Sequence, residues 1–314
     1  MSHMKVAVTG SNGLIGRAVV RALLAAGHAP ITVDRERADL VGDICEASFA
    51  RAVASSGDAV VHLAGRRAAV SAQRARGFDL LVGNLSVDIS MLKAAQIAKV
   101  PGIYASTVSI YPDRDVPGGF REVDADGFPA ESVRYSALGK IAAERMIEAI
   151  AEQDKLRWSI VRLVNTYGPH DNFGDGALVI PALIKRALQT APGAPFPLYG
   201  ANNERDFLYV DDAAAGIVAA LDHLQDAPNV YNLGTGHGYR IGDVARAVLA
   251  ACNTPCALTH EDGGIVGAAR KVVNPTRANT VLGWTPTISL EDGIARTVAW
   301  YQENRVTTTC GSAV

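Results

Sequence analysis

Residues 5–16, Lys-Val-Ala-Val-Thr-Gly-Ser-Asn-Gly-Leu-Ile-Gly, decide the fold prediction. The apolar run at 5–9 predicts a buried strand, and the spacing of apolar residues over 14–26 predicts a helix. Between them lies Gly10-x-x-Gly13-x-x-Gly16, in which Gly10 permits a tight turn and Gly13 a close backbone approach by a ligand. Gly16 allows the helix to pack closely on the strand. The free N–H groups of the helix N-terminus would then face the turn, where they favour phosphate.

The same alternation of short apolar runs and longer helical patterns continues through the first half. It predicts strands at 5–9, 29–33, 59–63, 102–106 and 158–163, and helices at 14–26, 84–99 and 136–152. Repeated βαβ units form a parallel sheet covered on both faces, so we expect an α/β fold with a Rossmann-type doubly wound sheet. The second half is less regular, with helices expected at 179–189, 238–251 and 290–304 and a separate segment, without an assigned element type, at 204–210.

This pattern predicts two domains. A dinucleotide-binding domain is expected over 4–170, with segments near 206–236 returning to it. A smaller α/β substrate-binding domain is expected over 171–305, and a frayed tail over 306–314.

An acidic residue ends the second predicted strand. Asp34 stands 18 residues after Gly16, where a carboxylate binds the adenosine ribose diol. A carboxylate repels a 2′-phosphate, so we expect NAD rather than NADP, although the adjacent Arg35 weakens that preference. Asp43 and Ile44 are placed to bracket the adenine. Leu63, Ala64 and Gly65 leave room for the cofactor, and His62 is expected to be a buried strand histidine beneath the site.

Composition limits the partners. With a net charge of −2 and a pI near 6.4, the chain has no general field for nucleic acid or an anionic membrane. No apolar run is expected to span a bilayer, and no signal peptide is recognised, so we expect a cytoplasmic protein. The scattered Cys45, Cys252, Cys256 and Cys310 are interpreted as structural thiols, and no metal site is expected. Residues 2–4 are interpreted as a cloning remnant.

With these segments in order, the sequence resembles the extended short-chain dehydrogenase/reductases of the nucleotide-sugar epimerase/dehydratase family over about 5–304. Five further motifs carry the resemblance: 104–111 (Tyr-Ala-Ser-Thr-Val-Ser-Ile-Tyr), 162–169 (Arg-Leu-Val-Asn-Thr-Tyr-Gly-Pro), 205–212 (Arg-Asp-Phe-Leu-Tyr-Val-Asp-Asp), 231–236 (Tyr-Asn-Leu-Gly-Thr-Gly) and 282–286 (Leu-Gly-Trp-Thr-Pro).

The resemblance implies a keto-sugar mechanism. A tyrosine removes a sugar hydroxyl proton, a lysine lowers the pKa of that tyrosine and holds the nicotinamide ribose, and a serine or threonine binds the same oxygen. It assigns these roles to Tyr135, Lys140 and Thr107, and substrate binding to Thr107, Asn165 and Arg205. The residues it places at the cofactor are Gly10, Asn12, Gly13, Leu14, Ile15, Gly16, Asp34, Arg35, Asp43, Ile44, Leu63, Ala64, Gly65, Asn84, Tyr135 and Lys140.

The sequence departs from the family's Tyr-x-x-x-Lys pattern, because Lys140 comes five positions after Tyr135. On a regular helix that spacing separates two side chains by about 140°, whereas Ser136 and Lys140 share a face. Three arrangements are open. A π bulge restores the pairing, Tyr135 precedes the first helical turn and reaches the site from the loop, or Ser136 replaces the tyrosine.

A second departure concerns the substrate. No arginine stands at the family's diphosphate-clamping position in 261–270, where Arg270 is either a shifted substitute or a surface charge.

A third departure concerns the reaction. Val108 and Ser109 follow Thr107 where the resembling dehydratases have Asp-Glu, which argues against dehydration. A nucleotide-sugar 4-epimerase is therefore expected, with a UDP-sugar as substrate. A dehydratase or keto-sugar reductase of the same family and a non-catalytic NAD-binding regulator remain the alternatives. The resemblance also implies a homodimer formed by helices 84–99 and 136–152.

Overall fold

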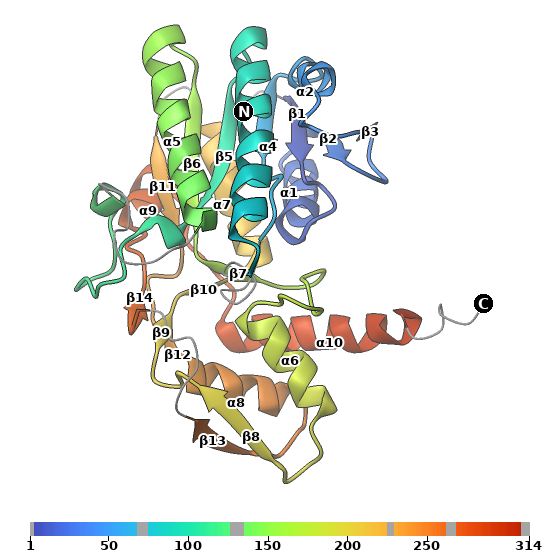
Figure 1. The fold of residues 1–314 in the computed structure, drawn as a ribbon, viewed down its shortest axis with the longest axis vertical. Helices are drawn as coiled ribbons and strands as arrows, with labels where there is room; N and C mark the ends of the chain where they lie inside the picture. The colour runs from blue at the N-terminus through green and yellow to red at the C-terminus, as the bar shows by residue number, and fades with distance from the viewer. Residues whose placement is uncertain (1–2, 68–74, 126–134, 225–228, 262–267, 309–314) are drawn as a thin grey trace.

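The computed structural model describes residues 3–67, 75–125, 135–224, 229–261 and 268–308. A parallel seven-stranded sheet forms its upper half, in the order β11-β6-β5-β4-β1-β2-β3 (Figure 1). The strands are β1 (Lys5–Thr9), β2 (Ala29–Asp34), β3 (Leu40–Val41), β4 (Ala59–His62), β5 (Gly102–Thr107), β6 (Trp158–Leu163) and β11 (Val230–Leu233). This order confirms the Rossmann-type doubly wound sheet, with the crossover between β1 and β4.

Alternate residues of the central strand supply the two cores. Val6 and Val8 of β1 point to the face covered by α1 (Leu14–Ala25) and α7 (Val210–Asp222), which pack side by side. Ala7 points to the opposite face, which is covered by α2 (Ala47–Ala54), α4 (Gly77–Ala98) and α5 (Tyr135–Asp154). The strand is therefore buried on both sides, which explains its unbroken apolar run.

The smaller part of the molecule lies below the sheet in Figure 1 and contains α6, α8 and α10. Its helices and strands are α6 (Val179–Gln189), β8 (Pro195–Tyr199), β9 (Glu204–Arg205), β12 (Tyr239–Arg240), α8 (Ile241–Ala251), β13 (Ala257–Glu261), β14 (Arg270–Lys271) and α10 (Leu290–Thr308). The parallel pair β7 (Asn165–Tyr167) and β10 (Phe207–Tyr209) connects it to the sheet. The short helices η1 (Val108–Ile110), η2 (Glu122–Ala125) and α9 (Thr276–Leu282) complete the described elements.

Two predicted helices begin at other residues in the structure, and one segment had no predicted element type. That segment, 204–210, contains β9 and β10 and then begins α7 at Val210. Helix α7 was not predicted because it is apolar nearly all round, with no polar stripe to mark its period. Helix α4 begins at Gly77 rather than at 84, and α8 begins at Ile241 because 239–240 pair as β12.

By length and composition, α4 is apolar enough to cross a membrane, although charged residues interrupt its apolar sequence and it therefore was not identified as an apolar run. The window combines small and apolar residues with few charges, which keeps its mean hydropathy high. In the structure, Met91 and Leu92 of this helix are buried in the core on the α2–α4–α5 face of the sheet, and α5 runs alongside it (Figure 1). Such a helix is also typical of the core of a soluble protein.

Candidate active site

The glycine turn joins β1 to α1. Gly10 has a φ of +69°, a conformation that glycine adopts at no steric cost. A Cβ on Gly16 would stand 2.2 Å from the carbonyl oxygen of Gly10, so only glycine lets α1 pack this closely on the turn. Gly13 is the N-cap of α1 and uses no side chain to cap it. The first N–H groups of α1 are thus left to meet a phosphate, as a dinucleotide site requires.

The end of β2 is tied to the same turn. The carboxylate of Asp34 accepts hydrogen bonds from the backbone N–H of Asn12 at 2.9 Å and of Arg35 at 2.8 Å. The side chain of Asn12 donates to the carbonyl oxygen of Glu36. Arg35 lies 4.0 Å from the carboxylate of Asp43, which holds this cation beside the next strand end. Asp34 is half-buried and adjoins the turn, where a carboxylate can bind a ribose hydroxyl.

The segments after β3 and β4 complete this side of the site. The Asp43 carboxylate accepts from the N–H of Cys45, and that bond lowers the pKa of Asp43, while Ile44 is buried. The hydroxyl of Thr9 accepts from the N–H groups of Leu63 and Ala64 at 3.1 and 3.2 Å.

Residues 64–66 are held on both sides. A Cβ on Gly10 would lie 3.1 Å from the backbone of Ala64, and a Cβ on Gly65 would lie 3.6 Å from the side-chain oxygen of Asn84. The buried Asn84 amide binds both the N–H and the carbonyl of Arg66. The strand end after β4 is therefore fixed against the glycine turn.

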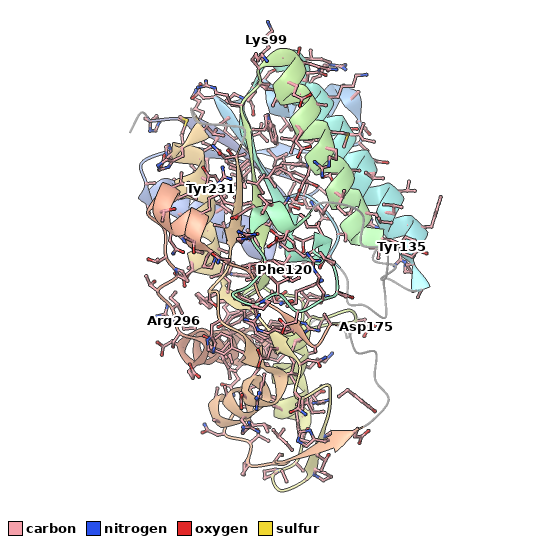
Figure 2. All side chains as sticks on the ribbon, turned by 90° about the vertical axis from the view of Figure 1, so that its left-hand side faces the viewer. Lys99, Phe120, Tyr135, Asp175, Tyr231 and Arg296 are labelled. Atoms are coloured by element: carbon pink, nitrogen blue, oxygen red, sulfur yellow. The ribbon has the colours of Figure 1, made fainter. Side chains whose placement is uncertain are left out.

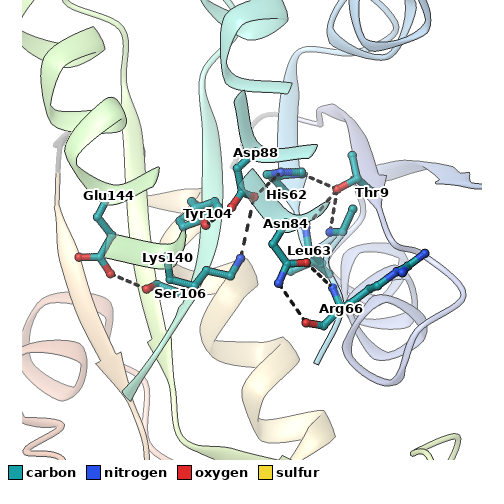
Figure 3. Close-up of polar contacts among 11 residues, drawn as sticks. Thr9, His62, Leu63, Arg66, Asn84, Asp88, Tyr104, Ser106, Lys140 and Glu144 are labelled. Carbon is teal, nitrogen blue, oxygen red and sulfur yellow. Dashed lines mark hydrogen bonds and ion pairs between the residues drawn. The ribbon is translucent and has the colours of Figure 1, made fainter. Parts of the chain in front are cut away.

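A buried polar network crosses the sheet beneath this turn (Figure 3). His62 is 1% exposed, and its Nδ1 lies 2.7 Å from the hydroxyl of Thr9, so the prediction of a buried strand histidine is confirmed. Its Nε2 lies 3.1 Å from Asp88, which also accepts the hydroxyl of Tyr104 at 2.8 Å. The ammonium of Lys140 is 4.0 Å from Asp88 and 4.3 Å from the centre of the Tyr104 ring.

Burial and the neighbouring groups together set the pKa values of Asp88 and Tyr104. Burial raises the pKa of Asp88, but the cation of Lys140 and the bonds from His62 and Tyr104 outweigh it, and the pKa is lowered overall. The pKa of Tyr104 rises well above its usual value because the phenol is buried and lies beside Asp88. A phenol in that position stays protonated and cannot act as the base.

The start of α5 shows neither the π bulge nor the loop position of Tyr135 that the sequence left open. Tyr135 is already the first residue of α5, and Tyr135–Asp154 is continuous α-helix with no π turn. The ring of Tyr135 lies against the start of α4, where a Cβ on Gly77 would be 2.1 Å from it. Figure 2 places Tyr135 at the edge of the molecule. Tyr135 and Lys140 thus point in different directions, and the side chain of Ser136 lies outside the described residues.

The end of β5 positions Thr107. This half-buried residue caps η1 by accepting from the N–H of Ser109 at 3.2 Å. Val108 is 6% exposed and packs in the core. The two positions after Thr107 therefore carry no group that can exchange a proton with a sugar carbon.

The substrate-side candidates lie where the sheet meets the smaller part. The side-chain amide of Asn165, on β7, donates to the carbonyl of Asp206 at 2.9 Å, and Arg205 donates to the carbonyl of Glu204 at 2.7 Å. Arg270 pairs with Glu204 and Asp115, each at 3.3 Å, so it is neither a freely solvated charge nor an unpaired clamp. Residues 262–267 of this region lie outside the description.

One ion pair joins two of the polar loops around the site. Arg67 follows β4, and its guanidinium lies 2.6 Å from the carboxylate of Asp171 and 3.1 Å from the carbonyl of Thr166. The Asp171 side chain is 2% exposed, and burial raises its pKa despite Arg67. The loop after β4 is thus held to the segment after β7.

Sequence reasoning missed Asp88, Tyr104 and a second buried set. Glu144 pairs with Arg162 at 2.7 Å and accepts the hydroxyl of Ser106. The one signal for Asp88 was a carboxylate within the apolar run of α4, which is costly unless it is paired.

Among the described residues, no group of three or more His, Cys, Asp and Glu side chains could hold a metal ion. Cys45 and Cys256 are free thiols, Cys252 is a buried thiol, and Cys310 lies outside the described residues.

Comparison with known proteins gives a consistent result. The family model described as "NAD dependent epimerase/dehydratase family" matches residues 6–234. A putative GDP-L-fucose synthase 2 of Oryza sativa subsp. japonica is 30% identical over 95% of this chain and 86% of its own. A GDP-mannose 3,5-epimerase 1 of Oryza sativa subsp. indica is 24% identical over 96% of this chain and 82% of its own. The Thermus thermophilus UDP-glucose 4-epimerase, solved with NAD, superimposes with a TM-score of 0.80 at 25% identity, over 96% of this chain and 99% of that one.

Proposed function

The chain belongs to the NAD dependent epimerase/dehydratase family, and we propose that it is an NAD-dependent nucleotide-sugar epimerase that acts at C4 of the sugar. The observation that carries this choice of reaction is the pair after Thr107. Val108 is buried in the core and Ser109 is a hydroxyl residue, so neither supplies the acid and base that dehydration requires. Epimerisation needs no proton donor or acceptor at a second carbon, and therefore fits these residues.

The residues around the turn fit NAD. A Cβ on Gly10 would meet the backbone of Ala64 and one on Gly16 the carbonyl of Gly10, so the turn stays close to backbone, and the N-terminus of α1 is at this turn. When bound, NAD would supply reversible hydride transfer at C4 of the sugar, which is the chemistry that epimerisation requires. The Asp34 carboxylate would hold the adenosine ribose and repel a 2′-phosphate, which supports NAD over NADP. We propose that the residues named from the sequence as cofactor-binding hold the bound NAD.

Three side chains are proposed to handle the C4 hydroxyl. Thr107 would bind its oxygen, Lys140 would supply the positive charge, and Tyr135 would take the proton. Tyr135 stands in the first turn of α5, where a residue makes the fewest helical hydrogen bonds. Turning it from Gly77 toward the site therefore breaks about one such bond, which costs roughly 1 kcal/mol.

Asn165 and Arg205 are proposed to bind the diphosphate of the substrate. Arg205 is half-buried on β9, and a guanidinium binds phosphate through two parallel hydrogen bonds. We propose a UDP-sugar as the substrate, supported by the likeness in fold and sequence to the T. thermophilus UDP-glucose 4-epimerase.

A second candidate is a keto-sugar reductase that acts on a GDP-sugar. The similarity to the rice GDP-L-fucose synthase, which covers nearly the whole chain, favours it. A reductase would consume NADH or NADPH stoichiometrically, whereas an epimerase uses no added reductant. This difference separates the two candidates in one assay.

The test is turnover of a panel of UDP-, GDP- and dTDP-sugars by the purified full chain, followed by absorbance at 340 nm and by separation of the products. Epimerisation predicts an epimer of one UDP-sugar and at most a transient 340 nm signal. Loss of added NADH with a GDP-keto-sugar would establish the reductase instead. Bound NAD without any product from the panel would contradict both and support a non-catalytic NAD-binding regulator.

We further propose that the protein is a homodimer built on α4 and α5. Phe78, Val82 and Ile89 are exposed large apolar side chains on α4, and their spacing places them within about 40° of one another around the helix. Helix α4 packs against α5, so a second copy related by a two-fold axis could cover the stripe and both helices.

Size-exclusion chromatography with light scattering tests this dimer. We expect V82K to give a monomer, because it buries a charge in the interface. The matched control L24K changes a residue of α1 that is 59% exposed, and should leave the dimer intact. A dimer that survives V82K would exclude this face as the interface.

A further inference from the structure

The carboxylate of Asp88 is almost completely enclosed beside the candidate site. Its side chain is 1% exposed, in the middle of α4, and three other elements supply its partners. His62 comes from β4, Tyr104 from β5 and Lys140 from α5 (Figure 3). A buried carboxylate in such a position is costly unless a cation compensates it.

Hydrogen-bond accounting identifies that cation. The Thr9 hydroxyl already accepts two backbone N–H groups, so its own hydrogen is left for Nδ1 of His62. Nδ1 is then an acceptor, and the ring carries its proton on Nε2, which donates to Asp88. The Tyr104 hydroxyl donates to the other oxygen of Asp88.

His62 and Tyr104 are consequently neutral donors, and neither balances the charge of the carboxylate. The remaining partner is Lys140, whose ammonium is 4.0 Å from Asp88. Glu144, one turn further along α5, is held by Arg162 and Ser106. Among the described groups that face Lys140, Asp88 is therefore the carboxylate that fixes it.

We propose that Asp88 is a positioning residue that holds the Lys140 ammonium over the face of the Tyr104 ring and ties it, through His62 and Thr9, to the strand that carries the glycine turn. The catalytic meaning of this position rests on the proposed function. The contact itself does not, since it is a property of the chain alone.

The helix geometry explains why such a residue is needed. With Tyr135 and Lys140 on different faces of α5, the helix does not bring the phenol and the ammonium together. Lys140 is held from α4 instead, by a carboxylate on the sheet side. The network joins this ammonium to Thr9, which directly precedes Gly10, so the cation and the turn are placed by one ion pair and the hydrogen bonds that continue from it.

Competitive acetylation with mass spectrometry measures the position of Lys140 directly, without any sugar. The full chain is treated with a trace of acetic anhydride, and the Lys140 rate is referred to those of Lys93 and Lys185. In D88N the ammonium loses its counter-ion, and we expect Lys140 to react about tenfold faster relative to these lysines. An unchanged relative rate overturns the proposal.

Tyr104→Phe is the matched control. It removes the other short hydrogen bond to Asp88 but keeps the ring face under Lys140 and the carboxylate beside it. The relative rate of Lys140 should stay within about twofold of the unsubstituted protein, since both contacts of the ammonium are retained. An equal acceleration in Y104F and D88N would show that the network only stabilises the fold, and would overturn the proposal.

Turnover provides a second measurement once a substrate is known. Under the proposal, D88N lowers kcat and leaves the KM of the nucleotide sugar unchanged, and its activity falls with rising pH at a lower pH than that of the unsubstituted protein. A purely structural role would lower the folded fraction without moving the pH profile. If no sugar is turned over, the proposed function fails while the acetylation result still stands.

If D88N does not fold, thermal unfolding of Lys140→Met and of the double variant K140M/D88N decides the matter. Removing Lys140 leaves Asp88 as an unpaired buried charge, so the double variant should unfold at a higher temperature than K140M. A double variant that is no more stable than K140M contradicts the pairing.

Discussion

The glycine turn and the start of α5 belong to the same candidate site but are specified in different ways. The turn is made by backbone, with a positive φ at Gly10 and a contact at Gly16 that excludes any side chain. At the start of α5 the chemistry depends on where side chains point, and one extra residue between Tyr135 and Lys140 turns them apart by about 100° more than the usual spacing. A site made by backbone geometry tolerates no change in the spacing of its residues. Where the chemistry depends on side chains, by contrast, residues of neighbouring elements can supply the same groups.

The sharpest test of that difference is the pair Tyr135→Phe and Ser136→Ala. If Tyr135 swings from Gly77 into the site, Y135F should lower kcat about 10²- to 10⁴-fold, the usual contribution of a positioned acid–base group. S136A should then retain nearly full activity. Steady-state rates with the sugar identified from the panel provide the measurement, and the thermal unfolding temperature of each variant serves as the folding control. The reverse ranking would assign the proton to Ser136.

How far the sequence could predict the structure follows from the same difference. The parallel sheet, the glycine turn and the burial of His62 were predictable because they depend on local period and spacing. The partnership of Asp88 with Lys140 was not, since these residues are far apart in the chain and meet only when α4 and α5 pack together. Helix α7 was missed for a related reason, because it is apolar on nearly every side.

On the substrate side, Asp206 provides a prediction about pH. This carboxyl is fully buried between β9 and β10, and it accepts from the N–H and the hydroxyl of Thr235 and from the N–H of Gly236. Burial outweighs these bonds and raises its pKa from 3.8 to about 6. The folded state therefore keeps a proton that the unfolded state has lost, so stability falls as the pH rises from about 4 to 6.

The expected loss is about 3 kcal/mol, which follows from the rise of this pKa from 3.8 to about 6. Denaturant unfolding of the unsubstituted protein and of D206N at pH 4, 5, 6 and 7 measures it. Between pH 4 and pH 7, the unfolding free energy of the unsubstituted protein should fall by that amount relative to the unfolding free energy of D206N. A difference that is independent of pH would show that Asp206 is ionised in the folded protein throughout.

The requirement for glycine in the turn is tested by comparing Gly16→Ala with Gly83→Ala. Both glycines lie inside helices, but a Cβ on Gly16 meets the carbonyl of Gly10, whereas one on Gly83 has no neighbour within 4 Å. G16A should cost about 1–3 kcal/mol of stability and weaken NAD binding. G83A should be neutral or stabilising by up to about 1 kcal/mol. Thermal unfolding with and without NAD measures both effects, and equal behaviour of the two variants would mean that the turn yields without cost.

The smallest expected effect concerns Asp34, whose side chain both supports the backbone of the glycine turn and is proposed to bind the cofactor ribose. Asp34→Ala removes the acceptor for the N–H groups of Asn12 and Arg35, which loosens the turn and weakens both cofactors alike. Loss of the ribose contact weakens NAD alone, and removal of the negative charge favours the 2′-phosphate of NADP. Calorimetric titration with both cofactors should therefore show the NAD-to-NADP affinity ratio falling about tenfold, the equivalent of one charge-assisted hydrogen bond. Arg35→Ala, which removes the neighbouring cation, should move the ratio in the opposite direction. An unchanged ratio in D34A would show that Asp34 only supports the backbone of the glycine turn, and the cofactor preference would then depend on residues beyond the turn.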